Sequence, residues 1–186
     1  VLLNDTYISS NTASITYSSS LITDTYEQYI ITGTGIRVHT NAKGNILAYF
    51  SNDNGSSYNT SNGDYVRSVL IGQGGLSDNA LNARHGDDDA IQITGNAFDF
   101  GRDGNAGHAA NFILRCYNLR NLDTDFEQNR YVNLQSTYDD RDTTHGVSCK
   151  GDYIFMANTT EINNIKLSVS HSNTFGQGEF RLYGVK

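Results

Sequence analysis

The chain has 186 residues, among them 18 Gly, 12 Tyr, no Pro and no Trp, and its formal net charge is −7. Asp outnumbers Glu 16 to 4 and charged residues make up only 18%, which excludes a helical bundle or coiled coil rich in Glu, Lys and Leu. The Gly residues show no three-residue period, which excludes collagen, and aromatic residues spread along the chain argue against disorder. The composition therefore indicates one compact β-rich domain over residues 1–186 with polar turns.

The hydrophobic period is two rather than 3.6, and this period predicts strands. The clearest case lies near the C-terminus, where Ile165, Leu167 and Val169 alternate with polar residues. In chain order, strands are predicted at 14–18, 29–39, 45–51, 65–71, 90–94, 111–119, 132–135, 152–157, 165–169 and 180–183. About ten short strands separated by turns predict an all-β fold, an antiparallel two-sheet jelly-roll sandwich.

Two of these predicted strands carry apolar residues on both faces. They contain Val69-Leu70-Ile71 and Ile154-Phe155-Met156. Strands that are apolar on both faces are typical of burial on both sides. We therefore expect them to lie inside an assembly or between sheets.

Turn-forming residues separate the predicted strands. Residues 52–55 (Asn-Asp-Asn-Gly) and 41–44 (Asn-Ala-Lys-Gly) are typical of hairpin loops, because Asn and Gly accept positive φ. Gly176-Gln177-Gly178 predicts a further turn, and residues 77–84 have room for one helical turn. The stretch 76–108 is the least regular, and we interpret it as long loops that flank one strand. Long loops on a sandwich are where binding function usually lies.

Cys116 and Cys149 are the only two cysteines. Cys116 shares a strand face with Phe112 and Leu114, so it is expected to be a small buried hydrophobe. Cys149 lies between two glycines, where a turn is expected. Nothing in the sequence sets the distance that a bridge requires, so free thiols are favoured over a Cys116–Cys149 disulfide.

Four residues are candidates for a binding site in loops. Asp87, Asp88 and Asp89 could bind Ca²⁺ through their carboxylate oxygens, but consecutive residues of an extended chain alternate sides. A solvated acidic loop is therefore favoured and no metal site is predicted. Tyr58 lies in a turn-rich segment and is the best candidate for an exposed aromatic face that could contact a sugar ring.

No catalytic residues and no cofactor are predicted. The four Glu residues are not paired with a second acid as sugar hydrolysis requires, and neither a nucleophile elbow nor a phosphate-binding loop is present. The 13 Lys and Arg residues are scattered, which argues against nucleic acid binding. The longest apolar run, Tyr153 to Ala157, is far too short to insert into a membrane. The chain begins at Val1 rather than Met, which indicates a processed product or a piece of a longer polypeptide.

Two segments resemble bacteriophage virion structural proteins that contain a jelly-roll domain. The first runs through residues 26–31 (Tyr-Glu-Gln-Tyr-Ile-Ile) and continues at 46–58, where the strand ends in Ser51, Asp53, Gly55 and Tyr58 at the family's spacing. The second is residues 162–167 followed by 175–185, and it is similar to the closing strands of these domains. Together the segments cover roughly a quarter of the chain, and residues 59–161 carry no such motif.

The resemblance implies a non-enzymatic tail-fibre, head-fibre or capsid-decoration protein, exposed on the virion surface outside the cell. Such a protein would form a homotrimer, contact other virion proteins in the capsid or tail, and stabilise the particle or bind a host surface glycan. The alternative is a soluble carbohydrate-binding module or lectin-like domain of a secreted bacterial protein. A sugar-degrading tailspike fragment is a third and weaker alternative.

Overall fold

The computed structural model describes residues 1–39, 44–74, 80–95, 109–120, 130–139, 146–157 and 160–186. Within these residues the chain forms twelve strands and no helix. The strands are β1 (Leu2–Ile8), β2 (Ser14–Tyr17), β3 (Gln28–Val38), β4 (Ile46–Ser51), β5 (Tyr65–Gly74), β6 (Ala80–Asp88), β7 (Ile91–Gln92), β8 (Ala110–Tyr117), β9 (Arg130–Asp139), β10 (Gly146–Phe155), β11 (Asn164–Val169) and β12 (Phe175–Val185).

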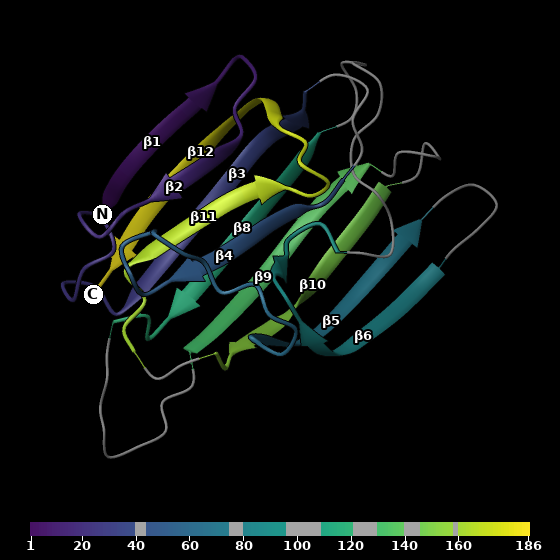
Figure 1. The fold of residues 1–186 in the computed structure, drawn as a ribbon. Coiled ribbons are helices and arrows are strands. Elements are labelled where there is room, and N and C mark those ends of the chain that lie inside the picture. Colours follow the sequence, from purple (N-terminus) through teal and green to yellow (C-terminus); the bar gives the residue numbers. More distant parts are fainter. Residues whose placement is uncertain (40–43, 75–79, 96–108, 121–129, 140–145, 158–159) are drawn as a thin grey trace.

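The strands form two antiparallel sheets that pack face to face (Figure 1). The large sheet has eight strands in the order β1-β12-β3-β8-β9-β10-β5-β6, and the small sheet has the order β2-β11-β4-β7. The pairing is nested: β3 pairs with β8 and β12 in the large sheet, while β4 pairs with β7 and β11 in the small sheet. This nested wrapping of distant strands gives the predicted jelly-roll sandwich.

Alternating side chains of both sheets point into one apolar core between them. In β8 every second residue from Ala110 to Cys116 is buried, and in β9 the same alternation runs from Arg130 to Tyr138. Four buried tyrosines are the largest core side chains, namely Tyr17, Tyr29, Tyr65 and Tyr153. Three of them anchor neighbouring backbone through their hydroxyls, at Thr23, at Phe50 and Asn59, and at Gln92. Tyr therefore acts as a core residue in this chain as well as a strand former.

The strands lie where the period of two predicts them, with two additions. β1 and β6 were not predicted, because Leu2–Ile8 and Ala80–Asp88 mix polar and apolar residues without a regular alternation. The predicted helical turn at 77–84 is wrong over its described part, since residues 80–84 belong to β6. β10 also begins at Gly146, so Cys149 lies within a strand and not near a turn.

The Asn52–Gly55 segment is a turn but not a hairpin loop. Asn54 and Gly55 have φ values of 61° and 83°, as the turn prediction requires. The strands before and after it, β4 and β5, belong to different sheets, so the segment carries the chain across the sandwich. The hairpin predicted around 41–44 is wrong for the same reason, because it joins β3 to β4, although residues 41–43 lie outside the described part of the chain.

The Gly176–Gly178 segment is an irregularity inside β12 and not a turn. The register against β3 shifts on both sides of Gln177, which is the signature of a β-bulge. Gly178 has a φ of 143°, and a Cβ atom built there would lie 2.4 Å from Ile36 Cδ1 and 2.9 Å from Ile36 Cα. The bulge therefore needs glycine both for its backbone conformation and for the close approach of β3.

We expect Gly178→Ala to destabilise the fold by about 2–4 kcal/mol, because strain at positive φ adds to overpacking against Ile36. Urea denaturation followed by circular dichroism measures the change. Gly74→Ala is the matched control, since a Cβ atom at Gly74 meets nothing within 4 Å. Equal stability of the two variants would contradict this account of the bulge.

Both cysteines are free and buried, as the sequence favoured. Cys116 lies on β8 and Cys149 on β10, and β9 separates these strands. Burial raises the pKa of the Cys149 thiol to about 11, and it raises the pKa of Cys116 as well. Both side chains are therefore neutral core groups at physiological pH.

We expect neither thiol to react with a disulfide reagent such as DTNB in the folded protein at pH 8, because the thiolate is disfavoured and access is blocked. In urea, two thiols per chain should react. Rapid release of one equivalent from the folded protein would show that one of these strands is open to solvent.

Candidate functional site

Tyr58, the predicted aromatic candidate, lies on the outer face of the small sheet with Tyr49 and Lys166. Lys166 on β11 is paired with Tyr49 on β4, and its Nζ atom lies 5.0 Å from the centroid of the Tyr49 ring. The same ammonium lies 4.1 Å from the centroid of the Tyr58 ring. These three residues form the Tyr–Lys cluster, in which cation–π contacts hold the lysine between two rings. Burial lowers the pKa of Lys166.

The turn that carries Tyr58 is organised by Asp53. The Asp53 carboxylate accepts hydrogen bonds from Ser51 Oγ (2.7 Å), from Ser57 N (2.9 Å) and from Ser57 Oγ (2.5 Å). The bonds from Ser57 and then from Ser51 lower the pKa of Asp53 to about 2. The Tyr58 hydroxyl at the end of this turn donates to Asn164 Oδ1 at 2.9 Å. The motif residues Ser51, Asp53 and Tyr58 thus have a structural role, which is to hold the turn against β11.

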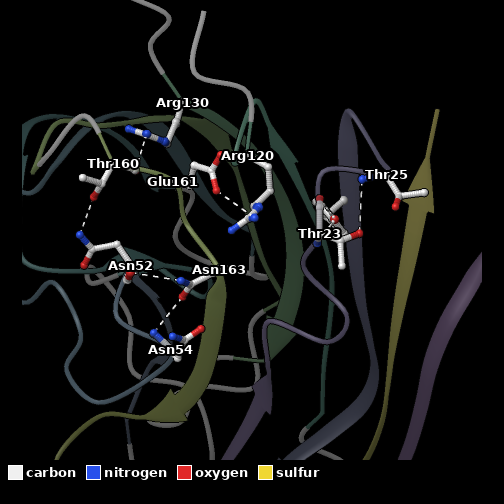
Figure 2. A network of polar contacts seen from close by, with 10 residues as sticks. Thr23, Thr25, Asn52, Asn54, Arg120, Arg130, Thr160, Glu161 and Asn163 are labelled. Atoms are coloured by element: carbon white, nitrogen blue, oxygen red, sulfur yellow. Dashed lines mark hydrogen bonds and ion pairs between the residues drawn. The ribbon is translucent and has the colours of Figure 1, made fainter.

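A second set of polar contacts fixes the other side of the same turn (Figure 2). Asn163 accepts a bond from Asn54 N at 3.0 Å through its Oδ1 atom and donates to Asn52 O at 3.1 Å through its Nδ2 atom. Asn52 in turn donates to Thr160 Oγ1, and Arg130 donates to the Thr160 carbonyl. The turn is therefore tied to the segment that precedes β11 and, through it, to the start of β9.

We expect Asp53→Ala to lower the melting temperature at pH 7, because three hydrogen bonds to the carboxylate are lost. The folded-state pKa is depressed, so the stabilisation is present in full above about pH 4 and declines as the pH falls towards about 2. Melting curves of both proteins between pH 2 and pH 7 should therefore converge at the acid end. A constant difference across this range would contradict the role of the ionised carboxylate.

The three consecutive aspartates lie at the end of β6, and they diverge. The expectation that all three lie in a loop is wrong for Asp87 and Asp88, which are the last two residues of the strand. Strand alternation places Asp87 opposite Val66 on the outer face of the large sheet and Asp88 on the inner face. Asp89 follows the strand and is exposed. This divergence gives no common point where the three carboxylates could hold one ion.

Asp88 is engaged inside the sandwich. Its carboxylate forms an ion pair with Arg67 Nη1 at 2.6 Å and accepts a bond from Gln92 Nε2 at 3.1 Å. The Asp88 side chain is only 8% exposed and that of Arg67 13% exposed. Burial raises the pKa of Asp88, and the charge of Arg67 opposes this shift. Asp88 is thus a structural residue in this chain, buried with its own partners.

Tyr49 is the residue on which two of the predicted aspartates, Asp88 and Asp89, act electrostatically. Burial raises the pKa of the Tyr49 hydroxyl, and the charges of Asp89 and Asp88 raise it further. The rings of Tyr49 and Tyr58 both contact the ammonium group of Lys166. Sequence reasoning missed Tyr49 and Lys166, although each is an outward-facing residue of a correctly predicted strand.

The contacts that the described residues make around Tyr58 are hydrogen bonds and cation–π contacts. Among the described residues, no group of three or more His, Cys, Asp or Glu side chains could hold a metal ion. Glu161 pairs with Arg120 at 2.9 Å, and Glu179 pairs with Arg181 at 2.6 Å. Lys166 covers a face of Tyr58 and Asn164 holds its hydroxyl, so that face is not free for a sugar ring.

The outer face of the large sheet carries a second feature, an apolar belt across four neighbouring strands. Tyr131 on β9 is paired with Ile154 on β10, and Ile154 is paired with Val66 on β5. Tyr117 on β8 extends this row, one step beyond the Cys116–Val132 pair. The belt consists of Tyr117, Tyr131, Ile154 and Val66, and Tyr131 is 45% exposed. Further along the same face Leu70 is 48% exposed.

The two predicted strands that are apolar on both faces, β5 and β10, contribute to this outer face. Their inner residues Val69, Ile71 and Phe155 are buried in the core as expected. Their outer residues are not: Leu70 and Met156 are exposed in the single chain, and Ile154 is half-buried. Within one chain, the expectation of burial on both faces is therefore met on the inner face only.

Comparison with known protein families, with curated protein sequences and with solved structures finds no match for this chain. In the described residues no helix is long and apolar enough to cross a membrane. The resemblance to phage structural proteins thus rests on the two sequence segments alone.

Proposed function

We propose that this chain is a non-enzymatic viral structural protein of bacteriophage type, exposed on the particle as a fibre or capsid-decoration component. It would stabilise the particle or attach it to the host surface. The observation that carries the proposal is the apolar belt on the large sheet, in which Tyr131 is exposed and its three apolar neighbours are half-buried, because contiguous apolar side chains at a protein surface mark an interaction site.

The same belt supports self-association, and we propose a homotrimer that also contacts other capsid or tail proteins. Apolar residues on both faces of β5 and β10 suit strands that are covered on both sides in an assembly. The two segments that resemble phage proteins form the small-sheet strands β4 and β11 and the strands β3 and β12 of the large sheet. They therefore contribute strands to both sheets of the sandwich.

A second function, glycan binding by a soluble module, is favoured by one observation. The Tyr–Lys cluster gathers two aromatic rings and a cation on the small-sheet face. Lys166 must leave the Tyr58 ring before a sugar can stack there. We therefore rank this function below the structural one.

Light scattering at micromolar concentration together with a glycan array distinguishes the two functions. The structural proposal expects a stable oligomer whose glycan binding, where present, depends on that assembly. A monomer that binds glycans strongly would favour the carbohydrate-binding module instead.

A further inference from the structure

We propose that copies of this chain associate through the outer face of the large sheet, about an axis that runs along β9. In this arrangement β8 of one copy lies against β10 of the next. The inference rests on the proposed function, because it names the surface and the residue pairs through which the structural protein assembles with itself.

The placement of charge on either side of β9 points to this axis. In the row next to the apolar belt, Arg115 on β8 is paired with Asn133 on β9, and Asn133 is paired with Asp152 on β10. Arg115 and Asp152 therefore lie one strand to either side of the axis and at the same height. Cyclic symmetry about an axis parallel to the strands brings β8 of one copy to β10 of its neighbour without a shift along the strand. Arg115 then faces Asp152 of the next copy.

The same axis also pairs residues of the apolar belt between copies. Tyr131 lies on β9, so the copies of this side chain meet at the axis. Tyr117 on β8 then faces Ile154 on β10 of the neighbouring copy, and Val66 on β5 faces Gln28 on β3 at the rim. At the centre of the face, apolar Tyr117 meets apolar Ile154 in one row and Arg115 meets Asp152 in the next, which is the self-complementarity that a symmetric interface requires. In the single chain, Asn133 links the two charges: it accepts from Arg115 at 3.4 Å and donates to Asp152 at 2.9 Å.

The face is large enough for a specific interface. It comprises the neighbouring strands β3, β8, β9, β10 and β5, and the last three are ten residues long. With strands about 4.8 Å apart and about 3.4 Å per residue, the face measures roughly 800 Å². This is about the area that one partner contributes to an interface of standard size, and in a trimer each chain divides it between its two neighbours.

The opposite surface of the molecule is less suited to this role. The small sheet packs on one face of the large sheet (Figure 1), and the other face is the outer face. On the outer face of the small sheet, Tyr58 and the turn before it already contact Lys166 and Asn164 of the same chain. The belt on the large sheet has no such cover among the described residues.

Charge reversal tests the residue pair. We expect Arg115→Asp and Asp152→Arg each to weaken association at least about 100-fold, because like charges then face each other in every interface. The double variant Arg115→Asp with Asp152→Arg restores opposite charges and should recover most of the affinity. Sedimentation velocity over a concentration series measures the dissociation constants, and circular dichroism checks that each variant is folded. Asn11→Arg, at an exposed residue between β1 and β2, is the matched control and should leave association unchanged.

The possible results distinguish a failure of this interface from a failure of the proposed function. A wild-type chain that is monomeric at micromolar concentration overturns the proposed structural function and this interface together. A wild-type oligomer that both single variants leave intact overturns the interface alone. Should the charge variants fail to fold, Tyr131→Ser replaces them, because it shortens an exposed side chain on the axis. An unchanged dissociation constant for Tyr131→Ser would equally contradict the interface.

Discussion

Phe50→Ala is expected to destabilise the sandwich by about 3–5 kcal/mol, one of the largest effects of any single change considered. Phe50 belongs to β4 of the small sheet and is fully buried. Its ring packs edge-on against Tyr65 and Phe155 of the large sheet, with centroid distances of 5.9 and 5.4 Å. Removal of the ring leaves a cavity between two sheets whose strands cannot easily move together, so most of the packing energy is lost.

Urea denaturation of wild type and variant gives this free-energy difference directly. Phe50→Leu is the matched control, because it keeps an apolar side chain of similar reach and should cost roughly 1 kcal/mol. If Phe50→Ala costs no more than Phe50→Leu, the volume that this side chain fills between the sheets does not hold the sandwich together. Aromatic pairs of this geometry add to the effect beyond their buried area.

Asp88→Ala is expected to cost about 3–5 kcal/mol, because it leaves Arg67 buried without its counter-charge. The ion pair at 2.6 Å lies at the edge of the core, where both side chains are largely shielded from water. Burial already raises the pKa of Asp88 in spite of Arg67, so the cost of desolvation outweighs the attraction within the pair. The pair is therefore costly to break but not a large net source of stability.

The double variant tests the pair as a unit. Arg67→Leu combined with Asp88→Leu removes both charges at once and should lie within about 1 kcal/mol of wild type, or even above it. Denaturant midpoints for the four proteins complete a double-mutant cycle. Additive losses in the double variant would show that Arg67 and Asp88 do not act as a pair.

Much of the fold was predictable from the period of two, because strands with one buried face show it directly. Residues 165–169 became β11 almost without change. The strands at the two ends of the large sheet were harder to detect. β1 and β6 each pair with a single neighbour, so fewer of their side chains are buried and their patterns are irregular.

The connections were predictable only in part. The residues at 52–55 predict a turn, and positive φ at Asn54 and Gly55 confirms it. Whether such a turn joins neighbours in one sheet or crosses between sheets depends on long-range pairing, which local residues do not encode. The turn predicted at Gly176–Gly178 is wrong for a similar reason: glycine occurs in bulges as well as in turns, and here it forms a bulge within β12.

The candidate site was harder still to predict. Tyr58 was chosen for exposure, but its contacts with Lys166 and Asn164 come from a strand more than a hundred residues away in the chain. Asp is a residue type that is usually exposed in loops, but Asp88 is buried at the end of a strand. Its burial is possible because Arg67 on the neighbouring strand compensates its charge. Partners of this kind are set by tertiary packing.

The central claim is that the outer face of the large sheet is covered by other copies of the chain. Hydroxyl-radical footprinting of the wild-type protein, read by mass spectrometry, tests this claim at single residues. In one chain Tyr131 is 45% exposed and Tyr7, on the edge strand β1, is 67% exposed. The account expects oxidation of Tyr131 to fall several-fold when the concentration is raised from nanomolar to tens of micromolar, while oxidation of Tyr7 stays constant. Oxidation of Tyr131 that remains as high as in the dilute protein would contradict it.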